Sequence, residues 1–415
     1  MRTVRTHGWI ATIRAQERNL ALAFVALVLS AVLTQSAHAQ TFTLLNTFNY
    51  TNGAEPYNNS FLQDKAGNFY SATDYGDLGA CFFGCGVVFK LSPSGKETVL
   101  YRFTGGKDGG MPYGLAVRDA AGNYFGATLA GGGFAGVCAG YGCGTVFKVD
   151  QHGKETVLYK FTGKADGMDP YGGLIQDPKG NFYGTTSFGG ASRFGTIFKL
   201  DKTGKLTILH SFAGTKDGGA PLAGLVRDSK GNLYGTTSGT GTSSDGTVFK
   251  LGVTEKFAVL HTFGGAPDGQ YPGYGALILD AAGNLYGTTR NGGGGSCQDG
   301  CGVVFKVDKT GHETILYSFT GAADGASPYS SLVQDAAGNL YGTTQSGGTG
   351  CGGFGCGVVF KLDTSGKETV LYSFSAGNDG ANPLAGLYRD KKGILYGSTY
   401  QGGADGAGTL FKLVP

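Results

Sequence analysis

Short runs of apolar residues, many of them alternating with polar ones and separated by Asp- and Gly-rich segments, cover this 415-residue chain from residue 40 onward. The unit from Pro170 to Gly214 is representative, with runs at 174–176, 182–186, 196–200 and 206–212. These runs are rich in β-branched and aromatic residues, a pattern that predicts antiparallel strands joined by tight turns. No segment after residue 39 shows helical periodicity, so the pattern predicts an all-β fold.

The unit recurs around the whole chain. A V/I/L-F-K tripeptide ends at Lys90, Lys148, Lys199, Lys250, Lys306, Lys361 and Lys412. A T-V-L-Y-S-F-like run follows each tripeptide except the last, and the missing copy stands at 43–48. Four strands in a period of about 50 residues are typical of a β-propeller blade. We predict a seven-bladed β-propeller with four-stranded antiparallel blades, in which 41–48 completes blade 7 beside 409–413 and closes the ring.

These repeats resemble the Gloeobacter/Verrucomicrobium tandem repeat of bacterial exported proteins. The resemblance rests on the motifs G-N-L-Y-G-T-T, G-T-V-F-K-L and D-G-x-x-P and covers essentially all of 40–415. It implies a β-propeller and export, and it transfers no catalytic residue because no activity is established for the family. Members often carry a C-terminal surface anchor, and its absence here favours a released or periplasmic protein.

The first 39 residues predict a secretory signal peptide. Arginines precede an apolar run at 20–33, which is too short to span a bilayer, and Ala37-His38-Ala39 suits a signal peptidase. We expect a secreted or periplasmic protein, 40–415, with no membrane span. The full chain carries +3, and residues 1–39 hold four Arg and one Glu, so the remainder is near neutral. A neutral surface gives no steering toward nucleic acid.

All eight cysteines fall in four close pairs, each in the loop between the second and third strands of a blade. Naming the strands A to D from the ring centre outward, these are B–C loops, and those with a pair are longer than those without. In an exported protein this pattern predicts a disulfide within each loop. Metal binding is the alternative, but the spacing is not C-x-x-C and no His lies nearby, so we expect neither metal nor cofactor. The pairs are Cys81/Cys85, Cys138/Cys143, Cys297/Cys301 and Cys351/Cys356.

The B–C and D–A loops share one face of a propeller, here the loop face, and the A–B and C–D turns share the other, the turn face. Variable loops on a rigid scaffold usually carry binding. Four charged residues break the repeat on the loop face: Asp74 and Arg290 just after strand B, and Glu55 and Asp169 before a D–A proline. On a face poor in charge the pKa of such a group could be shifted, so these four are the catalytic candidates.

Aromatic residues form a second group. Four tyrosines follow the D–A proline directly and a fifth comes one place later. They are expected either to pack between blades at the ring centre or to form a ring that stacks on sugars. With two residues after strand B, the candidate ligand-binding set is Tyr57, Tyr113, Tyr171, Tyr274, Tyr329, Gln345 and Tyr400.

Repeated D–A aspartates, such as Asp268, are predicted to organise turns. A calcium ion at each is disfavoured because nearby carboxylates are sparse in the sequence. The histidines after residue 39 are expected on outer strands and C–D turns, which disfavours a Ser-His-Asp triad or a His-rich zinc site on the loop face. Two functions remain: a monomeric recognition scaffold for a glycan or surface protein, or a polysaccharide hydrolase or lyase.

Overall fold

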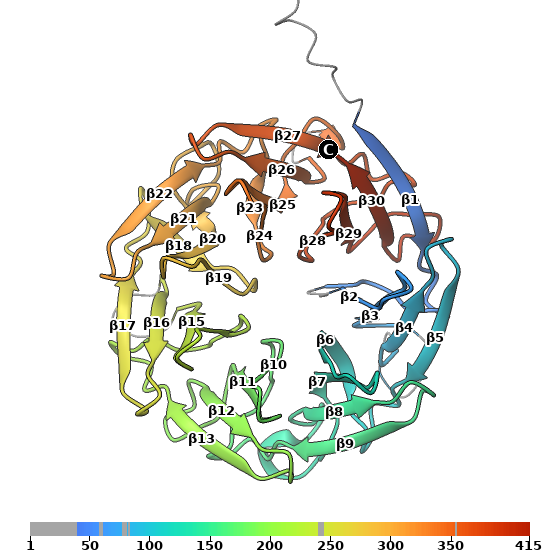
Figure 1. Ribbon diagram of the computed structural model, residues 1–415, viewed down its shortest axis with the longest axis vertical. Coiled ribbons are helices and arrows are strands. Elements are labelled where there is room, and N and C mark those ends of the chain that lie inside the picture. The colour runs from blue at the N-terminus through green and yellow to red at the C-terminus, as the bar shows by residue number, and fades with distance from the viewer. Residues whose placement is uncertain (1–39, 58–60, 77–80, 82–83, 240–244, 353–354) are drawn as a thin grey trace, which may run out of the picture. The chain divides into compact units, whose positions relative to one another are not determined.

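The computed structural model describes residues 40–57, 61–76, 81, 84–239, 245–352 and 355–415. Within it, Phe42–Val414 forms one compact unit of seven sheets arranged as a ring (Figure 1). The predicted signal peptide, residues 1–39, lies outside the described residues. Among the described residues, no helix has the length and apolar character that crossing a membrane requires.

The first four blades, with strands given from the ring centre outward, have these bounds. Blade 1 is β2 (Leu62–Gln63), β3 (Phe69–Thr73), β4 (Val87–Leu91) and β5 (Glu97–Arg102); blade 2 is β6 (Gly110–Arg118), β7 (Tyr124–Ala130), β8 (Thr145–Val149) and β9 (Glu155–Lys160). Blade 3 is β10 (Ile175–Gln176), β11 (Phe182–Thr186), β12 (Thr196–Leu200) and β13 (Leu206–Ser211); blade 4 is β14 (Val226–Arg227), β15 (Leu233–Thr237), β16 (Thr247–Leu251) and β17 (Phe257–Thr262).

Two of the remaining blades carry a short extra strand, β18 (Gly269–Pro272) or β23 (Ala326–Pro328), beside strand B. Blade 5 is β19 (Ile278–Leu279), β20 (Leu285–Gly292), β21 (Val303–Val307) and β22 (Glu313–Ser318); blade 6 is β24 (Val333–Gln334), β25 (Leu340–Ser346), β26 (Val358–Leu362) and β27 (Glu368–Ser373). Blade 7 is β28 (Tyr388–Arg389), β29 (Leu395–Thr399), β30 (Thr409–Val414) and β1 (Thr41–Thr47). One 3₁₀ turn, η1 (Gly136–Cys138), is described.

The predicted seven-bladed propeller is confirmed, including its closure. In blade 7 the order β28–β29–β30–β1 places the N-terminal strand on the outside, beside the last strand of the chain (Figure 1). Phe48, which follows β1, is fully buried, and its ring meets Phe89 of blade 1 at 5.5 Å. The N-terminal segment therefore both completes one blade and packs against the next.

The repeated motifs have direct structural causes. In the A–B turn of blade 3, Asp177 Oδ1 accepts a hydrogen bond from the Asn181 N–H at 2.9 Å, and Tyr183 donates to Asp177 Oδ2 at 3.1 Å. In strand B, Gly184 lies opposite Phe198, and a Cβ at Gly184 would lie 2.7 Å from Phe198 Cζ. The glycine of the G-T-T motif thus leaves space for the buried phenylalanine of strand C.

Neighbouring blades are joined on the loop face by one repeated contact, the blade joint. At the start of blade 3, the Asp169 N–H donates to the Cys143 carbonyl of blade 2 at 3.2 Å. Asp169 has a φ of 55°, and a Cβ at Gly144 would lie 2.8 Å from Pro170 Cδ. The next blade's proline therefore requires a glycine beneath it. The residues that donate in the seven joints are Glu55, Met111, Asp169, Ala220, Tyr271, Ser327 and Asn382.

Replacing Phe48 by Ala should lower the free energy of unfolding by roughly 3–5 kcal/mol, because it leaves a cavity between blades 7 and 1. Leu44→Ala is the matched control, since Leu44 lies on β1 with 38% of its surface exposed. Urea unfolding of both variants measures the difference. Equal, small losses in both would contradict the closing role of the N-terminal segment.

Candidate functional site

The four predicted disulfides are confirmed, each within one B–C loop. They join Cys81 to Cys85, Cys138 to Cys143, Cys297 to Cys301 and Cys351 to Cys356. The second cysteine of every pair supplies the carbonyl that accepts the blade-joint hydrogen bond, as Cys301 does for Ser327 at 2.8 Å. The disulfides therefore hold the residues that join one blade to the next, as well as shaping the loops.

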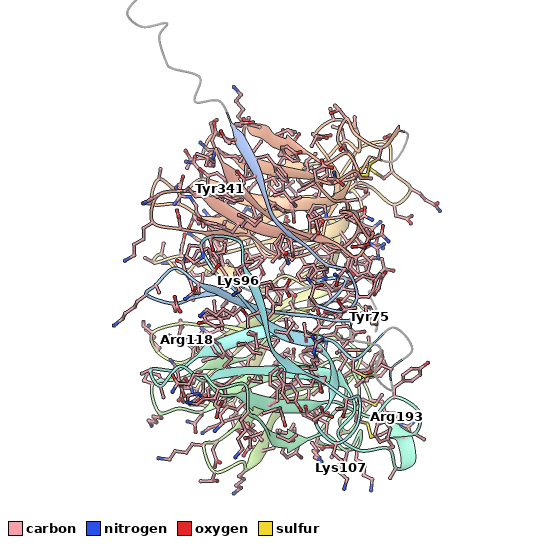
Figure 2. The ribbon with its side chains drawn as sticks, turned by 90° about the vertical axis from the view of Figure 1, so that its right-hand side faces the viewer. Tyr75, Lys96, Lys107, Arg118, Arg193 and Tyr341 are labelled. Atoms are coloured by element: carbon pink, nitrogen blue, oxygen red, sulfur yellow. A yellow bond between two sulfur atoms is a disulfide. The ribbon has the colours of Figure 1, made fainter. Side chains whose placement is uncertain are left out.

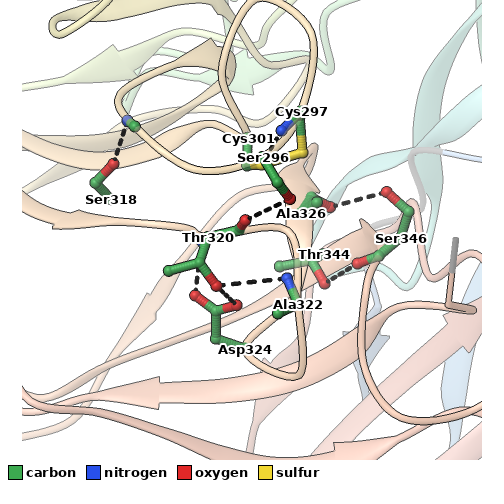
Figure 3. Close-up of a disulfide and its surroundings, with 11 residues drawn as sticks. Ser296, Cys297, Cys301, Ser318, Thr320, Ala322, Asp324, Ala326, Thr344 and Ser346 are labelled. Atoms are coloured by element: carbon green, nitrogen blue, oxygen red, sulfur yellow. Dashed lines mark hydrogen bonds between the residues drawn. A yellow bond between two sulfur atoms is a disulfide. The ribbon is translucent and has the colours of Figure 1, made fainter. Parts of the chain in front are cut away.

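Figure 3 shows how a bridged loop is tied to the D–A loop beside it. The Ser296 N–H, next to Cys297, donates to the Thr320 carbonyl at 3.0 Å. The Thr320 N–H and hydroxyl both donate to the Asp324 carboxylate, at 2.8 and 2.5 Å. The repeated D–A aspartate thus organises its turn, as the sequence predicted, and the turn supports the bridged loop.

The two faces differ in what they present. In Figure 2 the visible disulfides lie on the same side as Tyr75 and Arg193, while Arg118 lies toward the opposite side. Described grooves lie between neighbouring blades on the turn face, and the one bordered by Arg227, Asp280 and Lys309 has a volume of about 550 Å³. The sequence candidates instead lie on the loop face, around the start of each strand A.

Six of the candidate tyrosines meet near the ring centre. The ring of Tyr57 contacts those of Tyr113, Tyr274, Tyr329 and Tyr400, with centroids 5.1 to 5.8 Å apart. Tyr171 joins through Tyr113 at 4.8 Å. Because they come from six different blades, these rings meet across the ring rather than lining an open mouth. We call Tyr57, Tyr113, Tyr171, Tyr274, Tyr329 and Tyr400 the tyrosine cluster.

The tyrosine cluster combines packing with hydrogen bonding. Tyr113 and Tyr329 are buried, and the other four rings are half-buried. The hydroxyls of Tyr57 and Tyr329 form a hydrogen bond, and burial raises the pKa of Tyr57 to about 12. The Tyr57 phenol is therefore neutral at physiological pH, with a hydroxyl that can donate or accept.

Asp74 lies beside the tyrosine cluster with only 2% of its surface exposed. Its carboxylate accepts a hydrogen bond from the Tyr57 N–H, but its Oδ1 has no partner among the described residues. Burial raises the pKa of Asp74 well above its usual value, and the charge of Glu55 adds to the rise. The environment favours a protonated carboxyl group that can donate a hydrogen bond.

Glu55 is held close to Asp74 by the blade joint. It precedes Pro56 with a φ of 53°, and its N–H donates to the Ala407 carbonyl at 2.8 Å. Its side chain accepts hydrogen bonds from the hydroxyls of Tyr50, at 3.3 Å, and Tyr400. The structure thus brings together two of the four charged candidates, Glu55 and Asp74.

The other candidates border the tyrosine cluster at separate points. The Arg290 guanidinium lies 5.8 Å from the centroid of the Tyr329 ring, a cation–π contact. The charge of Asp169 acts on Tyr171, and burial raises the pKa of Asp169 to about 6. Gln345 is half-buried in β25. Among the described contacts, none joins the Asp169 carboxylate to that of Asp74 or Glu55.

Sequence reasoning passed over a group of exposed apolar side chains on the loop face. In the bridged loop of blade 2, Phe134, Val137 and Tyr141 are 48%, 56% and 82% exposed. In blade 3, Phe188 is 47% exposed and pairs with Met168 of the intervening D–A loop. For the three residues of blade 2 the sequence contained a signal, because apolar residues stand inside a loop insertion that contributes no strand to the core. We call Phe134, Val137, Tyr141 and Phe188 the apolar rim.

Comparison with known proteins identifies the family of this repeat. The family model described as Gloeobacter/Verrucomicrobia repeat matches residues 30–229 and 203–411. No curated protein matches the sequence.

Three solved structures are similar at low identity. A putative gluconolactonase has 12% identity and a TM-score of 0.38, over 65% of this chain and 80% of that one. A putative 6-phosphogluconolactonase from Bacteroides uniformis has 13% identity and a TM-score of 0.47, over 80% of this chain and 89% of that one. The extracellular domain of a putative one-component system from B. thetaiotaomicron has 10% identity and a TM-score of 0.49. The match covers 85% of this chain and 38% of that one, so this chain spans well under half the length of that chain.

The substitution Asp74→Asn should stabilise the protein more at neutral pH than in acid. The raised pKa means that, at neutral pH, wild type must take up a proton or bury a charge on folding, whereas near pH 4 that cost disappears. The unfolding free energy of the variant relative to wild type should therefore rise from about pH 4 to about pH 8. Urea unfolding at both pH values measures it, with Asp405→Asn, an exposed loop-face residue, as control. A pH-independent difference for Asp74→Asn would contradict the buried, protonated carboxyl.

Proposed function

We propose that this chain, which belongs to the Gloeobacter/Verrucomicrobia repeat family, is an exported recognition scaffold that binds a glycan on its loop face. The observation that carries the proposal is the apolar rim on blades 2 and 3. Single exposed apolar residues are ordinary on a protein surface, whereas several on adjoining loops mark an interaction site. Three of the four rim side chains are aromatic, which suits stacking on the apolar face of a sugar ring.

The loop that carries most of the apolar rim is already ordered. Val137 and Tyr141 flank or lie within the Cys138–Cys143 bridge, and Cys143 accepts the blade-joint hydrogen bond from Asp169. A ligand that binds a fixed loop does not have to order it, so less of the interaction energy is lost on binding. The apolar rim is therefore suited to present its aromatic rings to a ligand.

The ring centre supplies polar groups next to this surface. The half-buried rings of the tyrosine cluster, those of Tyr57, Tyr171, Tyr274 and Tyr400, offer phenol hydroxyls. Sugar hydroxyls both donate and accept, so they can pair with such groups. A glycan lying on the apolar rim would then be oriented by hydrogen bonds toward the ring centre.

Export and oligomeric state belong to the same proposal. Four disulfides fit an oxidising compartment, which is extracellular or periplasmic in bacteria. The pattern at 1–39 supports a cleaved signal peptide. We propose a monomer, because one chain supplies all seven blades and closes the ring, so no strand from a second copy is needed to complete a blade.

A second candidate is a polysaccharide-cleaving enzyme at the same face. One observation favours it: Asp74 is a buried carboxyl group with a raised pKa, beside Glu55 and the backbone of Tyr57. A protonated carboxyl could act as a general acid on a glycosidic oxygen, with a second carboxylate as base or nucleophile. Products from a bound polysaccharide would separate this function from simple binding.

Electrophoresis through native gels that contain single polysaccharides tests both functions. We expect at least one polymer to retard the protein, and the Phe134→Ala/Tyr141→Ala double variant to lose affinity. Stacking is worth about 1 kcal/mol per ring, so losing two rings should weaken binding roughly 30-fold. Val253→Ala is the control, since Val253 is 63% exposed in a C–D turn on the turn face.

The outcomes separate the possibilities. Equal affinity in the double variant and the control would place binding away from the apolar rim. No retardation by any polysaccharide would overturn glycan recognition, and capture of a purified surface protein through the same residues would then identify a protein ligand. New reducing ends or unsaturated products, lost in Asp74→Asn, would show cleavage.

A further inference from the structure

A second repeated arrangement lies on the outside of the ring, where the outer strand of one blade meets that of the next. At the boundary of blades 1 and 2, Tyr101 donates to the D–A aspartate Asp108 at 3.0 Å. The first residue of the next outer strand, Glu155, lies close enough for the charge of Asp108 to act on it. We call the aromatic residue, the aspartate and the first residue of the next outer strand an outer triad.

The outer triad of blades 4 and 5 differs from the others in combining a histidine with two carboxylates. Here the tyrosine is replaced by His261, the aspartate is Asp268, and the next outer strand begins with Glu313. The His261 Nε2 lies 3.3 Å from Asp268 Oδ2, and ligand atoms of all three residues lie within 4.8 Å of one another. In Figure 1 the two outer strands, β17 and β22, follow one another along the outside of the ring. Among the described residues, no other group of His, Cys, Asp and Glu converges in this way.

The surroundings of Glu313 suit a cation. Its Oε1 is buried and has no hydrogen-bond partner among the described residues. The equivalent oxygens of Glu155 and Glu368 are also unpartnered, so what distinguishes this triad is the histidine that converges on the two carboxylates. The side chains of His261 and Asp268 remain 19% and 26% exposed, so an ion can reach them from solvent.

We propose that His261, Asp268 and Glu313 bind one divalent transition-metal ion, such as Zn²⁺. One imidazole nitrogen and two carboxylate oxygens form a three-residue ligand set with positions left for water. The imidazole favours zinc and related ions over calcium, which takes oxygen ligands. An ion here would bridge the outer strands of blades 4 and 5. The cysteines are all bonded in pairs and offer no competing thiolate.

The chain supplies two natural controls. In the triad of blades 3 and 4, His210 lies 3.2 Å from Asp217, but Phe257 replaces the glutamate and stacks on the imidazole at 4.0 Å. In the triad of blades 5 and 6, Asp324 and Glu368 are both present, but Tyr317 replaces the histidine. Each lacks one ligand, so neither should bind zinc tightly.

Titration of tag-free, chelator-treated protein with Zn²⁺ against a chromophoric chelator tests the proposal. We expect one tight site per chain. Removing a residue that hydrogen-bonds to a metal ligand weakens metal binding about 10- to 100-fold. Glu313→Gln and His261→Gln remove a ligand itself, so each should weaken zinc binding at least that much. His210→Gln, at the sibling triad, should leave zinc binding unchanged.

A gain of binding guards against effects of misfolding. Tyr317→His completes the ligand set at the triad of blades 5 and 6, so this variant should bind a second zinc ion. Substitution with Co²⁺ should give absorption bands that are lost in Glu313→Gln. No stoichiometric zinc in wild type, or unchanged affinity in both Glu313→Gln and His261→Gln, would overturn the proposal.

Discussion

The hydrogen bond from the residue before each D–A proline to a carbonyl of the preceding blade determines how the ring is assembled. A left-handed backbone conformation turns that N–H toward the neighbouring loop, and the following proline then lies over a glycine. Six of these contacts join consecutive blades, and the seventh, from Glu55 to Ala407, joins the beginning of the chain to its end. The hydrogen-bonded pairing of β1 with β30 completes the same closure within blade 7.

The joint also explains where the functional groups lie. Because the D–A loop is fixed at its proline, the tyrosine that follows reaches the ring centre in five blades, and Tyr400, which follows strand B of blade 7, joins these rings there. The accepting carbonyl belongs to the second cysteine in the four bridged loops, so each disulfide holds an insertion directly on the joint. Variation between blades is thereby confined to loops whose bases are fixed, which is what a recognition surface requires.

The blades, their closure and the disulfides could be predicted from the sequence because each depends on local pattern. Strand runs, Asp-Gly turns and cysteines four or five residues apart all act over short distances. The meeting of the tyrosines could not be predicted, since it depends on how far the side chains of opposite blades reach across the ring. The same holds for Glu313, which lies 45 residues from Asp268 and meets it only because adjacent outer strands follow one another. The sequence could not place this carboxylate near Asp268.

Hydrogen exchange resolved to single amides tests the joint most directly. Four of the seven joint amides, those of Glu55, Asp169, Ala220 and Asn382, lie outside any strand, where exchange is ordinarily fast. The other three, those of Met111, Tyr271 and Ser327, lie in β6, β18 and β23. If these amides hold the blades together, they should be protected as strongly as strand amides such as that of Phe89 in β4, in all seven blades. Exchange as rapid as that of exposed loop amides would contradict the account, because the blades would then be held together without the joint.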